Sequence, residues 1–410
     1  MFFLKRDYSN KNFIIKGLIT AVLLSAFIYL SYFDVQYRVL NTVLAILGLY
    51  LLLVIPTRAL FITGFSLGIL WCYWISTSLQ YYELSYLTPV LLIGIGLGYG
   101  FIFRLFALYD RITFRILAIF AFTYFAPFGF NWVKLELMFI DSYIDITKQA
   151  FALVLLALYI IIKLKRLKIV FIIPLLFAYT NQTGIYIDNP NLKIQMPQLN
   201  VNQNLKWKAD YRDILIKKNL DLINQAINEK KDLIILPETS IPVILNKNED
   251  LLTFLKDKSK DIDIIVGSLY LENEQMFNTT YHFSNQEFKI AKKVVLVPFG
   301  EEIPLPKFFV KLINDIFFDG AEDYAKATQA SDFEVKGIKF RNAICYEATT
   351  DKIFENLNGV KYMIATSNNA WFTPSIEPTL QKLLLRYYAK KYDVTIFHVI
   401  NGSPNYIVRP

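Results

Sequence analysis

The chain has 410 residues, of which 54% are hydrophobic and 16% aromatic, and its formal net charge is +8. This apolar weight excludes a disordered protein and favours a membrane part. Residues 1–183 hold 15 Lys/Arg and 7 Asp/Glu, whereas residues 184–410 hold 28 of each. The second part is therefore neutral, which argues against nucleic acid as a partner.

The first part contains apolar stretches that approach the length needed to cross a bilayer, about 20 residues. We predict helical spans near residues 17–33, 39–55, 59–78, 87–108, 112–130, 149–162 and 168–182. Residues 1–183 are thus expected to form a transmembrane domain of about seven helices. The first stretch follows basic residues, as a signal peptide does, but no small-residue cleavage pattern comes after it, so we expect it to be retained.

Basic residues between the predicted spans indicate the orientation. If the N-terminus is inside, twelve fall on the cytoplasmic side and three, Arg38, Lys134 and Lys148, fall outside. The twelve are Lys5, Arg6, Lys11, Lys16, Arg58, Arg104, Arg111, Arg115, Lys163, Lys165, Arg166 and Lys168. By the positive-inside rule, seven spans place residue 184 and everything after it, including the C-terminus, in the periplasm or outside a cell with one membrane.

Three local patterns in this part have alternative explanations. Glycines at 94, 96, 98 and 100 form two overlapping G-x-x-x-G patterns, which favour close helix packing over a substrate path. Residues 64–68 match the G-x-S-x-G nucleophile elbow, but a mid-membrane position makes the match a coincidence. Residues 132–145, with Trp132 and Glu136, are expected to form an ordinary loop with an aromatic anchor, or else a lid.

From about residue 190 short β-rich runs alternate with helical ones. Strands are predicted at residues 193–199, 232–236, 263–270, 279–284, 289–297, 339–345, 362–367 and 394–400. Helices are predicted at residues 209–230 and 376–391. Residues 184–410 are therefore expected to form one α/β domain.

Three of the predicted strands lead into residues that can do chemistry. The strand at 232–236 runs into Pro237 and Glu238, the next candidate region carries Lys293, and the strand at 339–345 ends in Cys345. Each feature alone is common. The separations of 55 and 52 residues between the three groups make the combination much more specific.

Glu238, Lys293 and Cys345 resemble the Glu-Lys-Cys triad of the nitrilase, or carbon-nitrogen hydrolase, superfamily. Together with the membrane part, the chain resembles the apolipoprotein N-acyltransferases, the last enzymes of bacterial lipoprotein maturation. The motifs that carry this likeness are Lys206-Trp207, L-V-P-F-G-E at 296–301, I-C-Y-E at 344–347 and S-N-N-A-W-F at 367–372. The resemblance implies an α-β-β-α sandwich for residues 184–410.

Elementary chemistry assigns a role to each member of this triad. A thiol needs a neighbouring base or cation to react as thiolate near pH 7. Glu238 can take the proton of Cys345 and later that of an incoming amine. Lys293, aided by the backbone N–H of Tyr346, can stabilise the tetrahedral oxyanion. Lys292 is the rival for Lys293, which the family's eight-residue offset to Glu301 favours.

Further site residues are candidates with two possible roles. Glu301, Tyr346 and Glu347 could act in catalysis or support the triad structurally. Trp207 and Trp371 could line an acyl or peptide groove, as the resemblance implies, or anchor the chain at the interface. No metal-binding motif is present, so no metal and no cofactor are expected. Of the two cysteines, one is the proposed nucleophile, which leaves no structural disulfide.

The resemblance implies a monomeric inner-membrane enzyme with its catalytic domain on the periplasmic side. Cys345 would take an acyl chain from a membrane phospholipid, and the α-amino group of a diacylglyceryl-cysteine apolipoprotein would accept it. One alternative is a membrane-tethered amidase that hydrolyses a small amide. Another is a transporter or sensor whose domain only binds ligand, which the complete triad disfavours.

The sequence also departs from the family pattern. The usual span after the enzymatic domain is absent before Pro410, and Asn369 and Thr373 replace the usual Asp and Gly, which bears on the acceptor pocket. Segments at 240–255 and 302–330, the latter with Phe308, are rich in Phe, Ile and Leu. We expect them to dip into the bilayer rather than pack on the domain.

Overall fold

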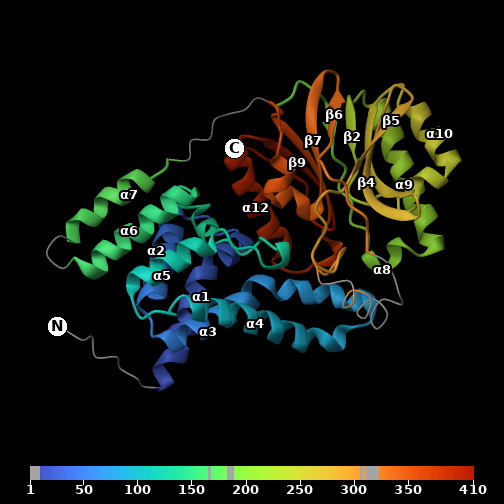
Figure 1. Cartoon of the computed structure of the whole chain (residues 1–410). Coiled ribbons are helices and arrows are strands. Elements are labelled where there is room, and N and C mark those ends of the chain that lie inside the picture. Colours follow the sequence, from blue (N-terminus) through green and yellow to red (C-terminus); the bar gives the residue numbers. More distant parts are fainter. Residues whose placement is uncertain (1–9, 165–167, 182–188, 305–307, 309, 311–322) are drawn as a thin grey trace. The chain divides into compact units, whose positions relative to one another are not determined.

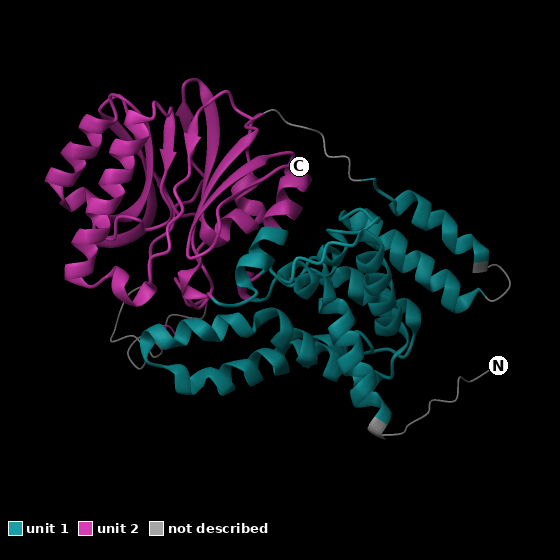
Figure 2. Ribbon diagram, turned by 180° about the vertical axis from the view of Figure 1, so that it is seen from behind, with its two compact units in different colours: residues 1–127, 131–183, 374–383 teal, residues 128–130, 184–373, 384–410 magenta. Residues whose placement is uncertain are grey.

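The structure is a computed structural model that describes residues 10–164, 168–181, 189–304, 308, 310 and 323–410. The chain divides into two compact units, coloured separately in Figure 2. Unit 1 comprises Met1–Pro127, Asn131–Thr183 and Pro374–Leu383, and unit 2 comprises Phe128–Phe130, Gly184–Thr373 and Leu384–Pro410. Lys5, Arg6, Lys165 and Arg166, which entered the charge count, lie outside the described residues.

Unit 1 is helical, with a helix at each predicted position. The α-helices are α1 (Asn10–Tyr32), α2 (Arg38–Val54), α3 (Thr57–Cys72), α4 (Thr88–Leu105), α5 (Ile112–Phe122), α6 (Lys148–Lys163) and α7 (Ile172–Ala178). Short 3₁₀ helices are η1 (Tyr73–Tyr82), η2 (Ser85–Leu87), η3 (Pro127–Gly129), η4 (Leu135–Phe139) and η5 (Lys168–Phe171). Unit 1 therefore has the helical content that a membrane domain requires.

Four of these helical segments are long and apolar enough to cross a membrane. They are Asn12–Tyr32, Thr57–Tyr82, Ser85–Leu105 and Ile112–Gly129, with α2 and residues 169–178 shorter. The predicted seven spans are thus supported by length for four only. The last predicted span is longer than the helix that forms in it. Its helix α7 ends at Ala178, and Tyr179 after it is extended and pairs with Ile144.

Glycines bring α3 and α4 into close contact. A Cβ on Gly64 would lie 2.3 Å from the carbonyl oxygen of Tyr99, and one on Gly100 would lie 2.9 Å from the ring of Phe61. A Cβ on Gly96 would meet Phe65, whereas Gly94 and Gly98 have open space. The packing role predicted for the G-x-x-x-G patterns is confirmed for positions 96 and 100. The Gly64 and Gly68 pair, rejected as a nucleophile elbow, serves the same packing.

The segment at 132–145 is neither an exposed loop nor a lid. Trp132 is 2% exposed and its ring centroid lies 5.0 Å from that of Trp74. Glu136, in the short helix η4, is fully buried. Apart from η4 the segment is a loop, as expected, but it is buried rather than exposed, because the apolar residues of Leu135–Phe139 pack inside unit 1 against α1 and α2.

Unit 2 is built on two five-stranded sheets. The first contains β1 (Ile194–Gln195), β2 (Leu233–Ile235), β3 (Asp263–Glu272), β4 (Gln275–Ser284) and β5 (Glu287–Lys292), in that order. The second has the order β10 (Tyr406–Val408), β9 (Thr395–Asn401), β8 (Tyr362–Asn368), β7 (Ile338–Ile344) and β6 (Asp332–Val335). The predicted strands are all present, while the short edge strands β6 and β10 were missed.

Helices cover the sheets, as Figure 1 shows for α9 (Ala209–Asn228) and α10 (Glu249–Lys258) beside β4 and β5. Their apolar residues share one core with the first sheet, including Ile223, Leu255, Ile264 and Tyr281. A second core joins residues of both sheets, such as Ile265 and Phe340. On the other side the part of α12 (Glu377–Tyr392) that belongs to unit 2, from Leu384 on, lies next to β9 (Figure 1). The order of layers is helix, sheet, sheet, helix.

Residues 240–255 pack on this domain and do not dip into a bilayer. Ile241, Leu245 and Leu255 are fully buried, and Leu251 is 7% exposed. The prediction for this segment is wrong because its apolar residues fill the core between α10 and the first sheet. In the second segment Phe308 is 73% exposed, whereas Phe309, Ile316, Phe317 and Phe318 lie outside the described residues.

Candidate active site

Sheet topology brings the ends of three strands to the places where the candidate residues lie. β2 and β3 run parallel. β4 is antiparallel to both β3 and β5, so β5 runs in the same direction as β2 and β3. Glu238 and Lys293 therefore follow strands that end at one edge of the first sheet. Cys345 directly follows β7, which pairs with the parallel strand β8 in the second sheet.

Lys293 is the centre of a buried ion cluster. Its side chain is 1% exposed, and Nζ lies 2.7 Å from Oε2 of Glu301 and 3.8 Å from Oε1 of Glu238. Burial alone would lower the pKa of Lys293, but the charges of Glu301, Glu238 and Cys345 together raise it above its usual value. The cluster thus holds a permanent positive charge near the thiol.

The neighbouring lysine has a different environment. Lys292 is part of β5, and its Nζ binds Oε2 of Glu272 at 2.6 Å and lies over the ring of Phe277. Its side chain is 20% exposed and that of Glu272 is 43% exposed. The geometry therefore favours Lys293 over its rival Lys292, because consecutive strand residues point to opposite faces.

Asn278, in the middle of β4, joins the two carboxylates, and sequence reasoning missed it. Its Nδ2 donates to Oε1 of Glu238 at 2.8 Å and to Oε1 of Glu301 at 3.1 Å. Glu301 also accepts from the backbone N–H of Val297 at 2.9 Å through Oε2. These hydrogen bonds orient both carboxylates. The eight residues from Lys293 to Glu301 include a turn, and the side chain of Glu301 stabilises this turn.

Glu238 lies in a tight turn that leaves β2. The N–H of Ser240 donates to the carbonyl of Pro237 at 3.1 Å. The turn lies so close to β3 that a Cβ on Gly267 would be 2.8 Å from Cα of Glu238 and 2.5 Å from the nitrogen of Thr239. Only glycine permits this approach. The Glu238 side chain is 9% exposed.

Cys345 begins a 3₁₀ helix, Cys345–Thr349, and its backbone has a conformation that residues other than glycine rarely adopt. Its φ is +54° and its side chain is partly exposed. Strained backbone of this kind costs about 1–3 kcal/mol and persists where surrounding contacts enforce it. The turn presents the thiol at the end of a buried strand, close enough to Lys293 for their charges to interact.

Glu347 supplies those contacts. Its Oε2 accepts from the N–H groups of Val294 at 2.6 Å and Val295 at 3.1 Å, and its Oε1 accepts from Ile344 at 2.7 Å. Burial raises the pKa of Glu347 to about 7, while the charge of Lys293 and these N–H groups act in the opposite direction. One carboxylate thus ties the residues after Lys293 to the residue before Cys345.

Tyr346 is buried, and its side chain is used in packing. Its hydroxyl donates to the carbonyl of Gly129 at 2.8 Å, and its ring stacks on Phe130 with centroids 6.2 Å apart. Phe128 meets Phe299 edge to face at 5.6 Å. Residues 128–130 thus belong to unit 2 and lie beside the turn of Cys345. Gly129 and Tyr346 are 217 residues apart in sequence, so no local pattern indicates their contact.

The two candidate tryptophans lie on short helices that follow strands or precede them. Trp207 follows α8 (Gln203–Lys206) and is 44% exposed. Trp371 ends the 3₁₀ helix Asn369–Trp371 directly after β8 and is half-buried. The role of both rings in substrate binding stays a prediction.

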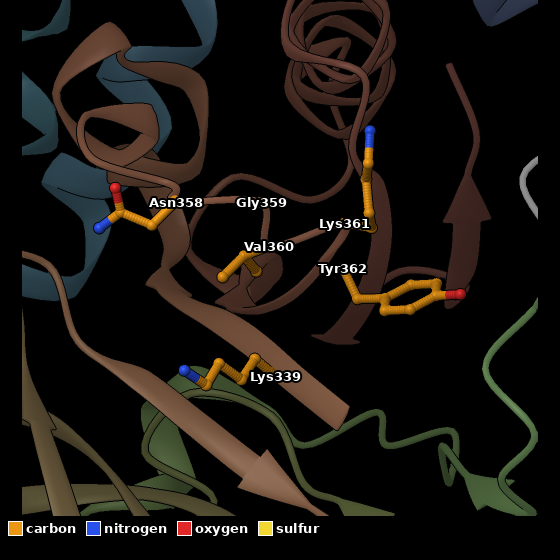
Figure 3. A pocket seen from close by; sticks show the side chains of 6 residues that line it. All are labelled: Lys339, Asn358, Gly359, Val360, Lys361 and Tyr362. Carbon is orange, nitrogen blue, oxygen red and sulfur yellow. The ribbon is translucent and has the colours of Figure 1, made fainter. Parts of the chain in front are cut away.

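No group of three or more metal-ligating side chains forms within the described ranges. A pocket of about 250 Å³ lies elsewhere in unit 2. It is lined by Lys339, Asn358, Gly359, Val360, Lys361 and Tyr362 (Figure 3). It lies where β7 and β8 begin, at the opposite ends of these strands from Cys345. This pocket is therefore separate from the candidate active site.

Comparison with known proteins gives two family matches that together cover most of the chain. Residues 11–181 match the apolipoprotein N-acyltransferase integral membrane domain, and residues 194–394 match the carbon-nitrogen hydrolase family. The apolipoprotein N-acyltransferase of Wolinella succinogenes is 41% identical over 396 residues, covering 96% of this chain and 95% of that protein. Both halves of the chain are thus similar to one kind of protein.

Two further relatives carry the same name. The apolipoprotein N-acyltransferase of Helicobacter hepaticus is 38% identical and covers 89% of this chain and 93% of its own length. That of Campylobacter jejuni is 37% identical, covering 97% of this chain and 90% of that protein. The likeness to these relatives therefore extends over most of the chain, including the membrane domain and the α/β domain.

Proposed function

Because the chain belongs to the apolipoprotein N-acyltransferase family, we propose that it transfers a fatty acyl chain from a membrane phospholipid to the α-amino group of a diacylglyceryl-cysteine apolipoprotein. The observation that carries the proposal is the buried cluster of Lys293, Glu238 and Glu301 near Cys345. A membrane domain suits this reaction, since donor and acceptor both carry chains that seldom leave the bilayer.

The first half-reaction forms a thioester. Glu238 takes the thiol proton of Cys345, and Sγ attacks the carbonyl carbon of the phospholipid ester. The oxyanion is stabilised by Lys293 and by the N–H of Tyr346, each such donor contributing about 3–4 kcal/mol. The carbon–oxygen bond to glycerol then breaks, and the lysophospholipid leaves with the proton that Glu238 carried.

The second half-reaction forms the amide. The neutral α-amino group of the apolipoprotein attacks the thioester and Glu238 takes a proton from it. The Sγ–carbon bond then breaks, and Glu238 passes this proton to Sγ, which regenerates the thiol of Cys345. Glu301 keeps Lys293 charged and in place, and Glu347 holds the backbone on both sides of the site. We place Trp207 and Trp371 at the groove that receives the substrates.

A direct assay distinguishes this reaction from the amidase alternative. The purified full-length protein, in phospholipid vesicles, is incubated with a synthetic diacylglyceryl-cysteine peptide, and the products are measured by mass spectrometry. We expect lysophospholipid and N-acylated peptide in equal amounts. Release of free fatty acid without acylated peptide, together with hydrolysis of a small amide, would instead support the amidase.

We also propose that the protein is a monomer and that all seven helices cross the inner membrane. The α/β domain of residues 184–410 then lies on the periplasmic side. Hydrogen bonds inside unit 1 support the alternation. Arg38, at the start of α2, donates to the carbonyls of Ser142 and Thr180. Two connections predicted to be outside therefore meet the predicted outer end of the seventh span. Arg115, near the start of α5, donates to the carbonyl of Ile55 after α2.

Accessibility of one introduced cysteine checks this topology. Lys260 is exposed at the surface of the α/β domain. In a Cys72→Ala background, we expect Lys260→Cys to react with a membrane-impermeant maleimide in intact spheroplasts, while Arg58→Cys, between α2 and α3, reacts only after lysis. Peptide mass spectrometry separates these positions from Cys345. The opposite pattern would reverse the orientation.

A further inference from the structure

Lys206 is a buried cation that the acyl-transfer mechanism does not use. It ends the short helix α8, and its side chain is 1% exposed. Nζ donates to the backbone carbonyl of Glu238 at 3.1 Å and to the hydroxyl of Thr239. Removing an ammonium group from water is costly unless its partners are fixed. Both of these partners belong to the turn that carries the general base.

The turn that Lys206 binds is strained. Thr239 has φ of +47°, in the left-handed region that β-branched residues strongly avoid. Other contacts approach the same turn, since Nδ2 of Asn219 donates to the carbonyl of Ser240 at 2.6 Å. Lys206 alone among these holds both the carbonyl of Glu238 and the side chain of Thr239. It is therefore well placed to keep the turn in its unusual conformation.

The helix that carries Lys206 is itself held in place. The side chain of Asn202 caps α8 through the N–H of Asn204 at 2.8 Å. Gln203 accepts from Nδ2 of Asn368, at the end of β8, at 2.8 Å. Asn401 in turn donates to Asn368 at 2.8 Å. Lys206 thus reaches from a helix anchored on the second sheet to a turn of the first sheet.

The state of the Lys206 amine agrees with this placement. Burial lowers the pKa of Lys206 to about 8, and the charge of Glu238 acts in the opposite direction. The amine is therefore mostly protonated at neutral pH, and it can donate to both oxygens of the turn.

We propose that Lys206 is a positioning residue that holds the Glu238 turn and thereby fixes the Glu238 carboxylate within reach of Cys345. This inference rests on the proposed function, because it assigns Lys206 its effect through the general base. A displacement of about 1 Å in a catalytic group can cost about 10²-fold in rate. Loss of the two Lys206 hydrogen bonds should therefore be felt in kcat rather than in substrate binding.

The test is Lys206→Met, which keeps the side-chain length and removes the charge and both hydrogen bonds. In the full-length protein in phospholipid vesicles, we expect kcat for peptide acylation to fall about 10²-fold, with KM within about twofold. We also measure alkylation of Cys345 by iodoacetamide from pH 5 to 9, resolved by peptide mass spectrometry. We expect its rate at pH 7 to fall and its midpoint to move to higher pH, because less thiolate forms.

A double variant shows whether Lys206 acts through Glu238. Glu238→Gln should slow alkylation of Cys345 on its own, and adding Lys206→Met to it should change the rate less than twofold. Equal factors with and without Glu238 would mean that Lys206 acts independently, and the inference would be overturned. If Glu238→Gln itself left the alkylation profile unchanged, the proposed mechanism would fail rather than the inference.

Two further variants keep the test decisive. Lys292→Met is the matched control, because Lys292 binds Glu272 and takes no part in the ion cluster of Lys293. It should leave kcat and the alkylation profile of Cys345 unchanged. If Lys206→Met does not fold, Thr239→Val removes one of the two acceptors and keeps the side-chain shape. We expect it to shift the alkylation midpoint in the same direction by a smaller amount. A wild-type profile in a folded variant would contradict the proposal.

Discussion

Replacing Cys345 by alanine is expected to reduce N-acyl transfer by at least about 10⁴-fold, as loss of a covalent nucleophile does in other enzymes. No other described cysteine can replace it, since Cys72 is buried in α3 of unit 1. The fold should persist, because alanine and cysteine have similar backbone preferences at φ of +54° and the side chain is partly exposed. The rate of peptide acylation in phospholipid vesicles measures the effect.

Cys72→Ala is the matched control for this variant. It removes a buried thiol of the same size far from the ion cluster in sequence, so it should retain nearly the wild-type rate. Cys345→Ser should remain almost inactive, because a hydroxyl is much less acidic than a thiol and Glu238 is a weak base. Acylation at an undiminished rate in Cys345→Ala would refute covalent catalysis by this residue.

Replacing Lys293 by methionine is expected to abolish measurable acyl transfer and also to destabilise unit 2. Removing one partner of a buried ion pair typically costs about 3–5 kcal/mol, because the remaining charges are left without compensation. Here Glu301 at 2.7 Å and Glu238 at 3.8 Å would lose their cation. Loss of the oxyanion donor adds a factor of about 10²–10³ in kcat. Chemical unfolding and single-turnover acylation measure the two effects.

The pH at which this experiment is done matters little below the alkaline range. The pKa of Lys293 is raised above its usual value of 10.5. The stability that the charged amine contributes is therefore fully present below pH 10.5 and is lost only as the pH rises above it. At neutral pH the variant should show the full loss.

Two variants separate charge compensation from catalysis at Lys293. Adding Glu301→Gln to Lys293→Met should recover part of the stability, since one uncompensated carboxylate disappears, but no activity. Lys292→Met should cost about 0–1 kcal/mol, as expected for a partly exposed pair, and leave activity unchanged. A full loss of activity in Lys292→Met, with Lys293→Met active, would show that the catalytic lysine is Lys292 and not Lys293.

Much of the α/β domain could be predicted because its strands are short, apolar and separated by polar turns. The run at 232–236 and the run at 339–345 correspond to β2 and β7 within two residues at either end. β6 and β10 were missed because each is a short edge strand, of four and three residues, and β6 also has mixed polarity. The helix α10 was missed because its few apolar residues were assigned to a segment that dips into the bilayer.

The site residues that sequence reasoning could propose are those whose type suggests chemistry. Glu238 and Lys293 come together because β2 and β5 end at one edge of the sheet, and the turn that follows Lys293 brings Glu301 to it. Asn278 could not be predicted, since an asparagine within a strand carries no sign that its amide bridges two carboxylates. Lys206 was noted only as part of a motif, because its contact with Glu238 depends on how α8 packs.

In the membrane domain the apolar stretches located the seven α-helices of the described residues, α1 to α7, but not their lengths. α7 stops after seven residues, where Tyr179 pairs with Ile144 in extended conformation. Hydropathy cannot distinguish such an apolar extended segment from a helix, since both bury the same side chains. Arg38 and Lys148, exceptions to the charge bias, bind backbone carbonyls within unit 1.

The most direct test of the central claim is the mass of Cys345 itself. Full-length protein is incubated in phospholipid vesicles without any acceptor, and the digested peptide that contains Cys345 is weighed before and after hydroxylamine treatment. We expect a hydroxylamine-labile gain of one fatty acyl chain on Cys345 and an equal amount of lysophospholipid. An unmodified Cys345 in a preparation that still acylates the peptide would contradict the thioester mechanism.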